Sequence, residues 1–105
     1  MVFARFFRDI SLGVKRSREW PRVRKQHLLE HPTCERCGGR KGLEIHHIKP
    51  FHLEPELELA PENLATLCER MKCHFIFGHL YDWKSYNSEL EADLSLWKLK
   101  ERNRP

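Results

Sequence analysis

A partial apolar stripe among basic residues between positions 15 and 29 predicts a basic helix. Ser17 is suited to cap its N-terminus, because a serine hydroxyl accepts a hydrogen bond from a free backbone N–H. Pro21 is tolerated only in a first helical turn, where its missing N–H leaves no bond unmade. The His31-Pro32 pair ends the helix, since the residue before a proline avoids the helical conformation.

Short apolar segments bounded by chain breakers predict two strands, at residues 43–48 and 64–67. Pro50 closes the first strand, and residues 50–61 are predicted to form an extended loop with three glutamates. Residues 73–77 predict a short helix that ends at the following glycine, Gly78. The order of these elements predicts a small α+β fold.

The clearest helix pattern lies near the C-terminus. Ser88 and Glu91 have the spacing of a capping box, in which two side chains bond backbone N–H groups reciprocally. The apolar residues at helical spacing behind them predict a helix packed on the core: Leu90, Leu94 and Trp97. The neighbouring aromatic residues are also interpreted as packing residues rather than platforms for nucleobases: Tyr81, Trp83 and Tyr86.

The length of 105 residues predicts one domain near the lower limit of comfortable core size. A core this small is often stabilised by a bound metal. No apolar run approaches the roughly 18 residues that a membrane span needs. Charges interrupt the apolar stretch Phe3 to Asp9, which argues against a secretory signal and predicts a cytoplasmic protein.

The net charge of +4 is unevenly distributed along the chain. Residues 1–31 contain eight Lys and Arg against three Asp and Glu, whereas residues 32–105 contain eleven against twelve. A basic arm of this kind favours binding to a polyanion. The alternative is a helix face that is simply solvated.

Four cysteines form two pairs, Cys34-x2-Cys37 and Cys68-x4-Cys73. In a reducing compartment, paired cysteines bind metal more often than they form disulfides. Four thiolates around one zinc ion make a closed structural site with no open coordination position. Glycines 38 and 39 permit the tight turn that the first pair requires. Buried free cysteines are the alternative.

The remaining candidate chemistry lies in the histidines. Successive residues on a strand face opposite sides, so His46 and His47 are expected to have different roles. A neutral imidazole can be a metal ligand or a base near pH 7. The other histidines are interpreted as surface or packing residues: His27, His31 and His52.

Taken together, the motifs in residues 34–80 resemble the HNH endonucleases in their four-cysteine, zinc-ribbon form. The elements in order are Cys34-x2-Cys37, Leu43 to Pro50 around His46-His47, Glu62-Asn63-Leu64, Leu67-Cys68 and Cys73-His74. The letters of the family name fall on His47, Asn63 and His74. The chain differs from the common pattern in its four-residue gap between the last two cysteines.

The resemblance implies a role for each of these residues. His47 corresponds to the general base, and Asn63 to the residue that positions the base-bearing segment. His46 and His74 correspond to ligands of the catalytic metal. His79 is the further candidate ligand, although residues five apart on a regular α-helix diverge by roughly 140°. Gly78 could unwind that turn and bring His79 back.

The resemblance also implies a fold and an activity. The fold would be a ββα-metal finger with a zinc ribbon, flanked by the basic helix and the C-terminal helix. We expect a single nuclease domain over residues 1–105, with a basic arm at 1–31, the metal core at 32–80 and a packing helix at 81–105. One structural zinc and one catalytic Mn²⁺, Mg²⁺, Ni²⁺ or Zn²⁺ would be bound.

The expected partner is double-stranded DNA, cleaved by a monomer or a homodimer at phosphodiester bonds to leave 5′ phosphates. The basic residues expected to contact it are Lys15, Arg16, Arg18, Arg22, Arg24 and Lys25. The alternative function is a zinc-ribbon binding module without catalysis, which would need the cysteines but not His47 or Asn63.

Overall fold

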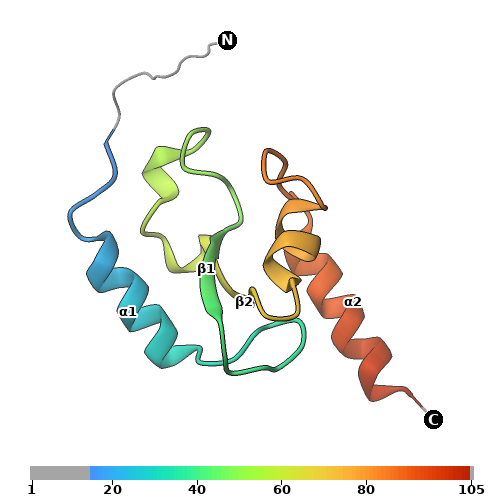
Figure 1. Cartoon of the computed structure of the whole chain (residues 1–105). Coiled ribbons are helices and arrows are strands. Elements are labelled where there is room, and N and C mark those ends of the chain that lie inside the picture. The colour runs from blue at the N-terminus through green and yellow to red at the C-terminus, as the bar shows by residue number, and fades with distance from the viewer. Residues whose placement is uncertain (1–14, 105) are drawn as a thin grey trace.

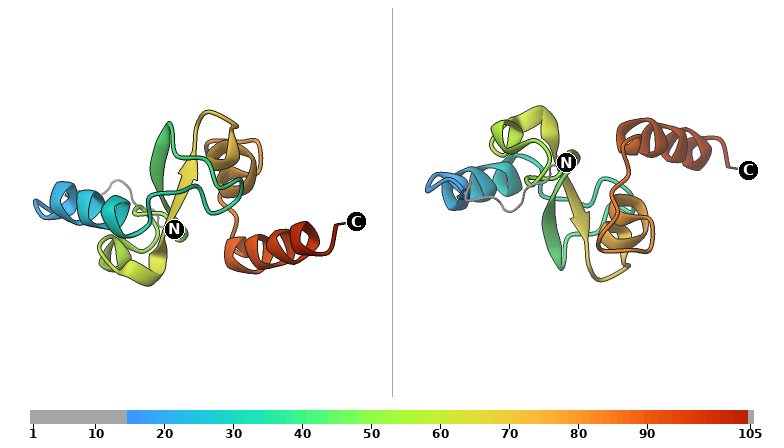
Figure 2. Two further views of the ribbon diagram at one scale, coloured as in Figure 1. Left: turned by 90° about the horizontal axis from the view of Figure 1, so that it is seen from below. Right: turned by 90° about the horizontal axis from the view of Figure 1, so that it is seen from above.

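The computed structural model describes residues 15–104, so the Phe3 to Asp9 stretch lies outside the described residues. A two-stranded antiparallel sheet, β1 (Leu43–His47) with β2 (Leu64–Cys68), forms the centre. Helix α1 (Trp20–Glu30) lies on one side of the sheet, and α2 (Leu90–Arg102) lies on the other (Figure 1). Both views in Figure 2 show this separation. The fold is small and α+β, as predicted.

The sheet register determines how the sequence motifs are arranged. Leu43 pairs with Cys68 at one end, and His47 pairs with Leu64 at the other. Every residue of β2 is buried, including the polar Thr66. The loop between the strands contains two short 3-10 helices, η1 (Pro55–Leu57) and η2 (Pro61–Asn63). The predicted strands and the predicted loop are therefore confirmed, apart from these two turns.

Helix α1 begins later than its sequence suggested. Pro21 lies in the first turn as expected, but the capping position is Glu19 and not Ser17. Ser17 is held elsewhere, because its backbone N–H donates to the Glu58 carboxylate (2.9 Å) and its hydroxyl accepts from Glu19 N (3.0 Å). The C-terminal limit is confirmed, since the helix stops at Glu30, before His31-Pro32.

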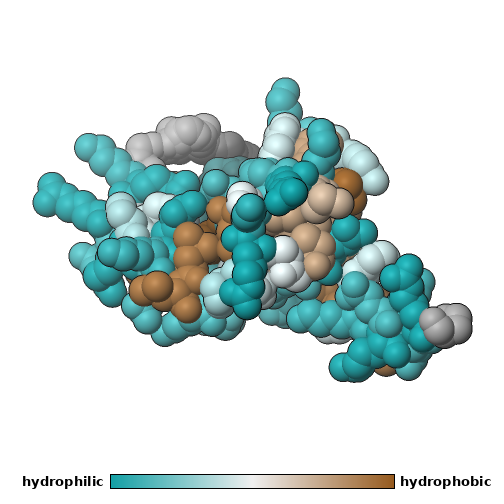
Figure 3. All heavy atoms as spheres, turned by 60° about the horizontal axis from the view of Figure 1, so that its bottom comes forward, coloured by the Kyte–Doolittle hydropathy of each residue, from teal (hydrophilic) through white to brown (hydrophobic). Residues whose placement is uncertain are grey.

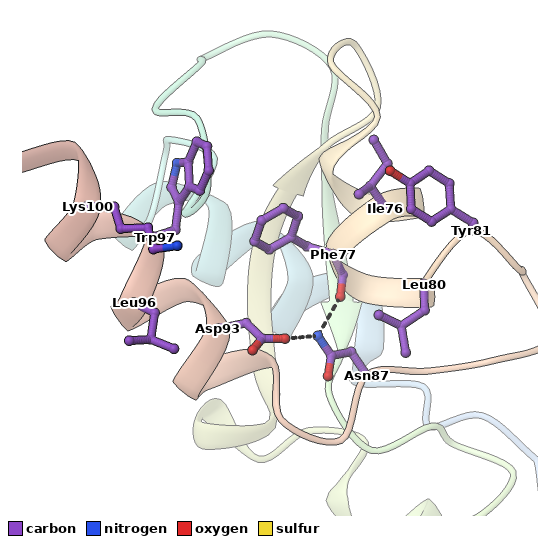
Figure 4. A pocket seen from close by; sticks show the side chains of 9 residues that line it. All are labelled: Ile76, Phe77, Leu80, Tyr81, Asn87, Asp93, Leu96, Trp97 and Lys100. Atoms are coloured by element: carbon purple, nitrogen blue, oxygen red, sulfur yellow. Dashed lines mark hydrogen bonds between the residues drawn. The ribbon is translucent and has the colours of Figure 1, made fainter. Parts of the chain in front are cut away.

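Helix α2 also begins without its predicted cap. Ser88 and Glu91 do not form a capping box, because the buried side chain of Asn87 determines the entry into the helix. Its Oδ1 accepts from Glu89 N (2.9 Å), and its Nδ2 donates to Phe77 O (3.0 Å) and Asp93 Oδ2 (2.7 Å) (Figure 4). These bonds join α2 to the short helix η3 (His74–Gly78) beside a hollow of about 340 Å³.

The apolar core is small and includes three of the four cysteines. Its buried members are Cys34, Ala65, Leu67, Cys68, Cys73, Leu90 and Leu94. Leu90 and Leu94 bring α2 onto this core, as the helical stripe predicted. The Arg36 guanidinium lies over the rings of Phe77 (5.0 Å) and Trp97 (4.4 Å), which joins the cysteine turn to α2.

The surface is mainly hydrophilic on the face shown in Figure 3, with apolar patches near its centre. None of the helices within residues 15–104 has the length and apolar character that crossing a membrane requires.

Candidate active site and cysteine cluster

Three histidines from separate elements converge at one point beside the sheet. His46 comes from β1, His74 opens η3, and His79 follows it. His74 Nε2 lies 3.1 Å from His46 Nδ1 and 3.2 Å from His79 Nε2. One ring nitrogen from each of the three lies within 4.8 Å of the others. The geometry can hold a metal ion.

The hydrogen bonds on the far side of two rings fix their tautomers. His79 Nδ1–H donates to the Ser85 carbonyl (2.7 Å), and His74 Nδ1–H donates to the Glu69 carboxylate (3.1 Å). When both rings are neutral, the two Nε2 atoms therefore present lone pairs to each other across 3.2 Å. Two facing lone pairs repel unless a cation lies between them. The donor set fits a divalent metal that accepts imidazole nitrogen.

Burial favours the uncharged form of two of the three rings, His46 and His79. Burial, and to a lesser extent the neighbouring imidazoles, lower the pKa of His46 to about 3. Burial also lowers the pKa of His79, although the hydrogen bond to the Ser85 carbonyl opposes that shift. Neutral rings are the state in which imidazole binds metals. The buried His46 Nε2 has no hydrogen-bond partner among residues 15–104.

A π-helical turn brings His79 to the cluster. Residues 74–78 form a π-helix, in which backbone bonds span five residues rather than four. Residues five apart on such a turn lie near one another, as residues four apart do on an α-helix. The expectation of a short helix ending at Gly78 is confirmed, and its winding removes the divergence that a regular α-helix would impose on His74 and His79.

Gly78 is needed for the position of His46. A Cβ atom on Gly78 would lie 2.9 Å from Cε1 and 3.0 Å from Nδ1 of the His46 ring. Its φ angle is not in the left-handed region, so the constraint is space rather than backbone conformation. Any side chain at this position would displace the ring that faces His74.

We therefore predict that Gly78→Ala weakens metal binding at the histidine cluster. Glycine to alanine in a helical turn usually stabilises a protein, whereas overpacking here should destabilise by about 1–3 kcal/mol. Manganese titration and thermal unfolding measure both effects. In a His46→Ala background the same substitution should cause little loss of stability. Manganese binding by Gly78→Ala equal to that of the original chain would contradict the steric argument.

His47 faces away from the three histidines, as the strand alternation predicted. Its Nε2–H donates to the Glu58 carbonyl (2.9 Å), which leaves the Nδ1 lone pair available as a base. The Trp20 ring packs against it with centroids 4.6 Å apart. Burial lowers the pKa of His47, and the positive charge of Arg16 lowers it further, while the bond to the Glu58 carbonyl raises it. The ring is therefore neutral at neutral pH.

Asn63 braces the segment that follows His47. Its Oδ1 accepts from Lys49 N (2.8 Å), and its Nδ2 donates to the carbonyls of Lys49 and Leu57 (both 3.1 Å). Asn63 O also accepts from Ile48 N (2.9 Å). The side chain is 4% exposed, so all three bonds are shielded from water. This asparagine ties the end of β1 to the loop that supplies the Glu58 carbonyl.

Glu58 is one of the three glutamates of the loop predicted at residues 50–61 and was not among the predicted site residues. Its carboxylate is buried and accepts from Arg16 Nε (2.8 Å), besides Ser17 N. The run of alternating glutamates gave no signal for this inward position. The Arg16–Glu58 pair connects the segment before α1 to the loop that orients His47.

The four cysteines gather at the opposite end of the sheet. Their sulfurs lie within 4.8 Å of one another, and none is in a disulfide. Cys37 N–H points to Cys34 Sγ (3.5 Å), and Met71 N–H points to Cys68 Sγ (3.4 Å), so the two turns share one arrangement. Lys72, with a left-handed φ of 61°, accommodates the four-residue gap. Four free sulfurs in this arrangement fit a tetrahedral zinc ion.

Arg36 is a second residue that sequence analysis missed. Its Nη1 lies 3.8 Å from Cys73 Sγ. Burial raises the pKa of the Cys73 thiol, and the guanidinium opposes that shift. A thiolate at Cys73 would thus have one positive side chain beside it.

The basic residues of the first segment differ in their surroundings. Several already have acidic partners: Arg16 with Glu58, Arg22 with Glu19 (2.8 Å) and Arg24 with Glu44 (3.4 Å). Lys15, Arg18 and Lys25 are exposed. His31 and His52 are exposed and His27 is buried against His31, with centroids 4.5 Å apart.

The aromatic residues after η3 pack less completely than a core position would require. Tyr81 and Trp83 contact the Phe75 ring but remain 68% and 56% exposed. Trp83 also lies against the rings of His79 (4.9 Å) and His74 (5.3 Å). Tyr86 is partly buried, in line with the prediction.

Comparison with known proteins agrees with these arrangements. Residues 34–75 match the family model described as HNH endonuclease, a span that includes both cysteine pairs, the histidine doublet, Asn63 and His74. No curated protein and no solved structure matches the chain. The chain therefore contains an HNH endonuclease domain at residues 34–75, and its gathered cysteines are consistent with the zinc-ribbon type of that family.

Proposed function

We propose that this protein is a metal-dependent DNA endonuclease that hydrolyses phosphodiester bonds. The observation that supports it most is the convergence of His46, His74 and His79 on one point, with His74 Nε2 3.1 Å from His46 Nδ1 and 3.2 Å from His79 Nε2. These three side chains would hold one divalent cation. The neutral His47 next to His46 in β1 would act as the general base.

The catalytic step begins at His47. Its Nδ1 accepts a proton from the attacking water, while its Nε2–H remains donated to the Glu58 carbonyl. That carbonyl dipole stabilises the positive charge that develops on the ring. Through its three hydrogen bonds to the flanking segments, Asn63 would hold the Glu58 carbonyl and the His47 ring in a fixed relative position.

The cation would supply Lewis-acid polarisation of the scissile phosphate and stabilise negative charge on the departing 3′ oxygen. An all-imidazole donor set favours manganese, nickel or zinc over magnesium. His74 and His79 are oriented for this role by Glu69 and the Ser85 carbonyl, so their Nε2 atoms need no rearrangement.

The cysteine cluster has a separate, structural role in this proposal. Cys34, Cys37, Cys68 and Cys73 would bind one zinc ion with no open position, so this ion would take no part in hydrolysis. Because Cys68 ends β2 and Cys73 directly precedes His74, the zinc would also fix where η3 begins.

The DNA backbone would be bound by the basic segment before and within α1. Trp20 of α1 contacts His47, so this helix begins beside the proposed base. Lys15, Arg18 and Lys25 are exposed for phosphate contact, with Arg22 and Arg24 at the helix surface. Such contacts give affinity that does not depend on base sequence.

A plasmid-nicking assay with added manganese, together with elemental analysis, tests the function. We expect one tightly held zinc per chain, one exchangeable second ion and conversion of supercoiled to nicked DNA. A zinc-ribbon binding module without catalysis would hold the zinc and bind DNA but would cut nothing. Absence of nicking by a zinc-loaded protein supplied with manganese would contradict the nuclease proposal.

The pH dependence of cleavage should identify the base. Because burial and Arg16 lower the pKa of His47, the neutral base persists below its usual titration range, and kcat/KM should fall only at more acidic pH. Arg16→Gln removes a positive charge, so the pKa should rise and the acidic limb should move to higher pH. Arg22→Gln, which also removes one arginine but at an exposed pair with Glu19, is the control. Equal profiles for the two variants would contradict this assignment.

A further inference from the structure

An exposed tryptophan lies beside the histidine cluster. Aromatic side chains are mostly buried in folded proteins, yet Trp83 keeps 56% of its surface accessible. Its ring makes tilted or edge contacts with the rings of His79 (4.9 Å), His74 (5.3 Å) and Phe75 (4.9 Å). The accessible part is therefore adjacent to two of the proposed metal ligands.

The loop that presents Trp83 is held in place by hydrogen bonds. Asp82 N–H donates to His79 O (3.0 Å), and Ser85 N–H donates to Asp82 O (2.8 Å). Lys84 N–H donates to the Asp82 carboxylate (2.9 Å), and the His79 imidazole is bonded to Ser85 O. An exposed ring on a loop fixed in this way loses little freedom when a ligand stacks on it.

The backbone of this loop is also strained. Leu80 and Tyr81 have φ angles of 55° and 69°, in the left-handed region that favours glycine. Residues other than glycine rarely adopt these angles, and such strain is concentrated at functional sites. Here the strain accompanies a chain reversal between His79 and Trp83, whose rings contact each other.

We propose that Trp83 is a stacking platform for an unpaired nucleobase next to the cleaved phosphodiester. Bases inside a continuous duplex have both faces covered by their neighbours, so an exposed indole can stack only on a base that has left the stack. The exposed Lys84 next to it can contact the adjoining phosphate. This inference rests on the proposed nuclease function and names its preferred substrate: DNA with an unpaired nucleotide at the cleavage point.

Binding of matched oligonucleotides tests this inference without cleavage. The probes are a fully paired duplex, the same duplex with one bulged 2-aminopurine, and a single strand, each mixed with zinc-loaded protein without added manganese. Stacking is worth about 1–3 kcal/mol per base, so the bulged duplex should bind roughly 5- to 150-fold more tightly than the paired one. The 2-aminopurine fluorescence should be quenched on binding.

Variants separate stacking from a purely structural role. Trp83→Leu keeps apolar bulk and should lose both the preference and the quenching, whereas Trp83→Phe should keep part of both. Tyr81→Leu, which removes an exposed aromatic ring without a contact to the histidines, should keep the preference. Manganese affinity should be the same in all three.

Three results would overturn the inference. They are equal binding of paired and bulged DNA, an undiminished preference in Trp83→Leu, and a loss of preference in Trp83→Leu that is matched by a loss of manganese affinity. A different result would contradict the nuclease proposal. A protein that prefers bulged DNA but cuts nothing supports the stacking site and contradicts the nuclease function.

Discussion

His47→Ala is expected to abolish nicking while the chain stays folded. General-base catalysis typically raises the rate by about 10²- to 10⁴-fold. The hydrogen bond from His47 Nε2 to the Glu58 carbonyl leaves the Nδ1 lone pair of His47 as the proton acceptor. The measurement is the initial rate of plasmid nicking at saturating manganese. Manganese affinity should be retained, because His47 faces away from the three clustered histidines.

Two further variants make this test specific to the base. His47→Gln can still donate a hydrogen bond toward the Glu58 carbonyl and fill part of the space beside Trp20, but its amide cannot accept the proton. It should be as inactive as His47→Ala and closer to the original chain in thermal stability. His52→Ala removes an exposed histidine from the following loop and should leave the rate unchanged. Undiminished nicking by both His47 variants would overturn the assignment of the base.

Cys37→Ser, or a strong chelator, is expected to unfold the chain. Within residues 15–104, three of the seven buried residues of the core cluster are cysteines of the proposed zinc site, so losing the metal would disrupt the core itself. Structural zinc in small domains contributes about 10–16 kcal/mol of apparent binding free energy, which is comparable to the entire stability of a domain. Circular dichroism during heating, with zinc content measured on the same sample, gives the result.

The control for this experiment removes a ligand from the other cluster. His79→Ala should keep the zinc and the thermal transition but lose manganese binding, because the two clusters share no side chain. A cooperative thermal transition in zinc-free protein would contradict the structural role of the cysteines. Loss of the fold in His79→Ala would show that the two sites do not act separately.

Strands and helix ends could be predicted from the sequence where neighbouring residues alone determine them. Strand alternation separated His46 from His47, the buried run of residues 64–67 is β2, and Pro32 follows the end of α1. Starts of helices were predicted less well. Ser17 and Ser88 have the right chemistry for caps, but Ser17 N–H instead donates to Glu58, and Asn87, which donates to Phe77 O, accepts from Glu89 N where α2 begins.

The candidate chemistry could be recognised from the residues alone: two cysteine pairs, the histidine doublet, Asn63 and His74, in the order that the HNH family model matches. The position of His79 depends on the folded chain, because a π-helical turn and the space that Gly78 leaves free have no counterpart in a regular helical pattern. The folded chain also placed Glu58 inward and Trp83 outward. Those positions depend on contacts between segments far apart in the chain, such as Arg16 with Glu58, and periodicity carries information only about neighbours along one element.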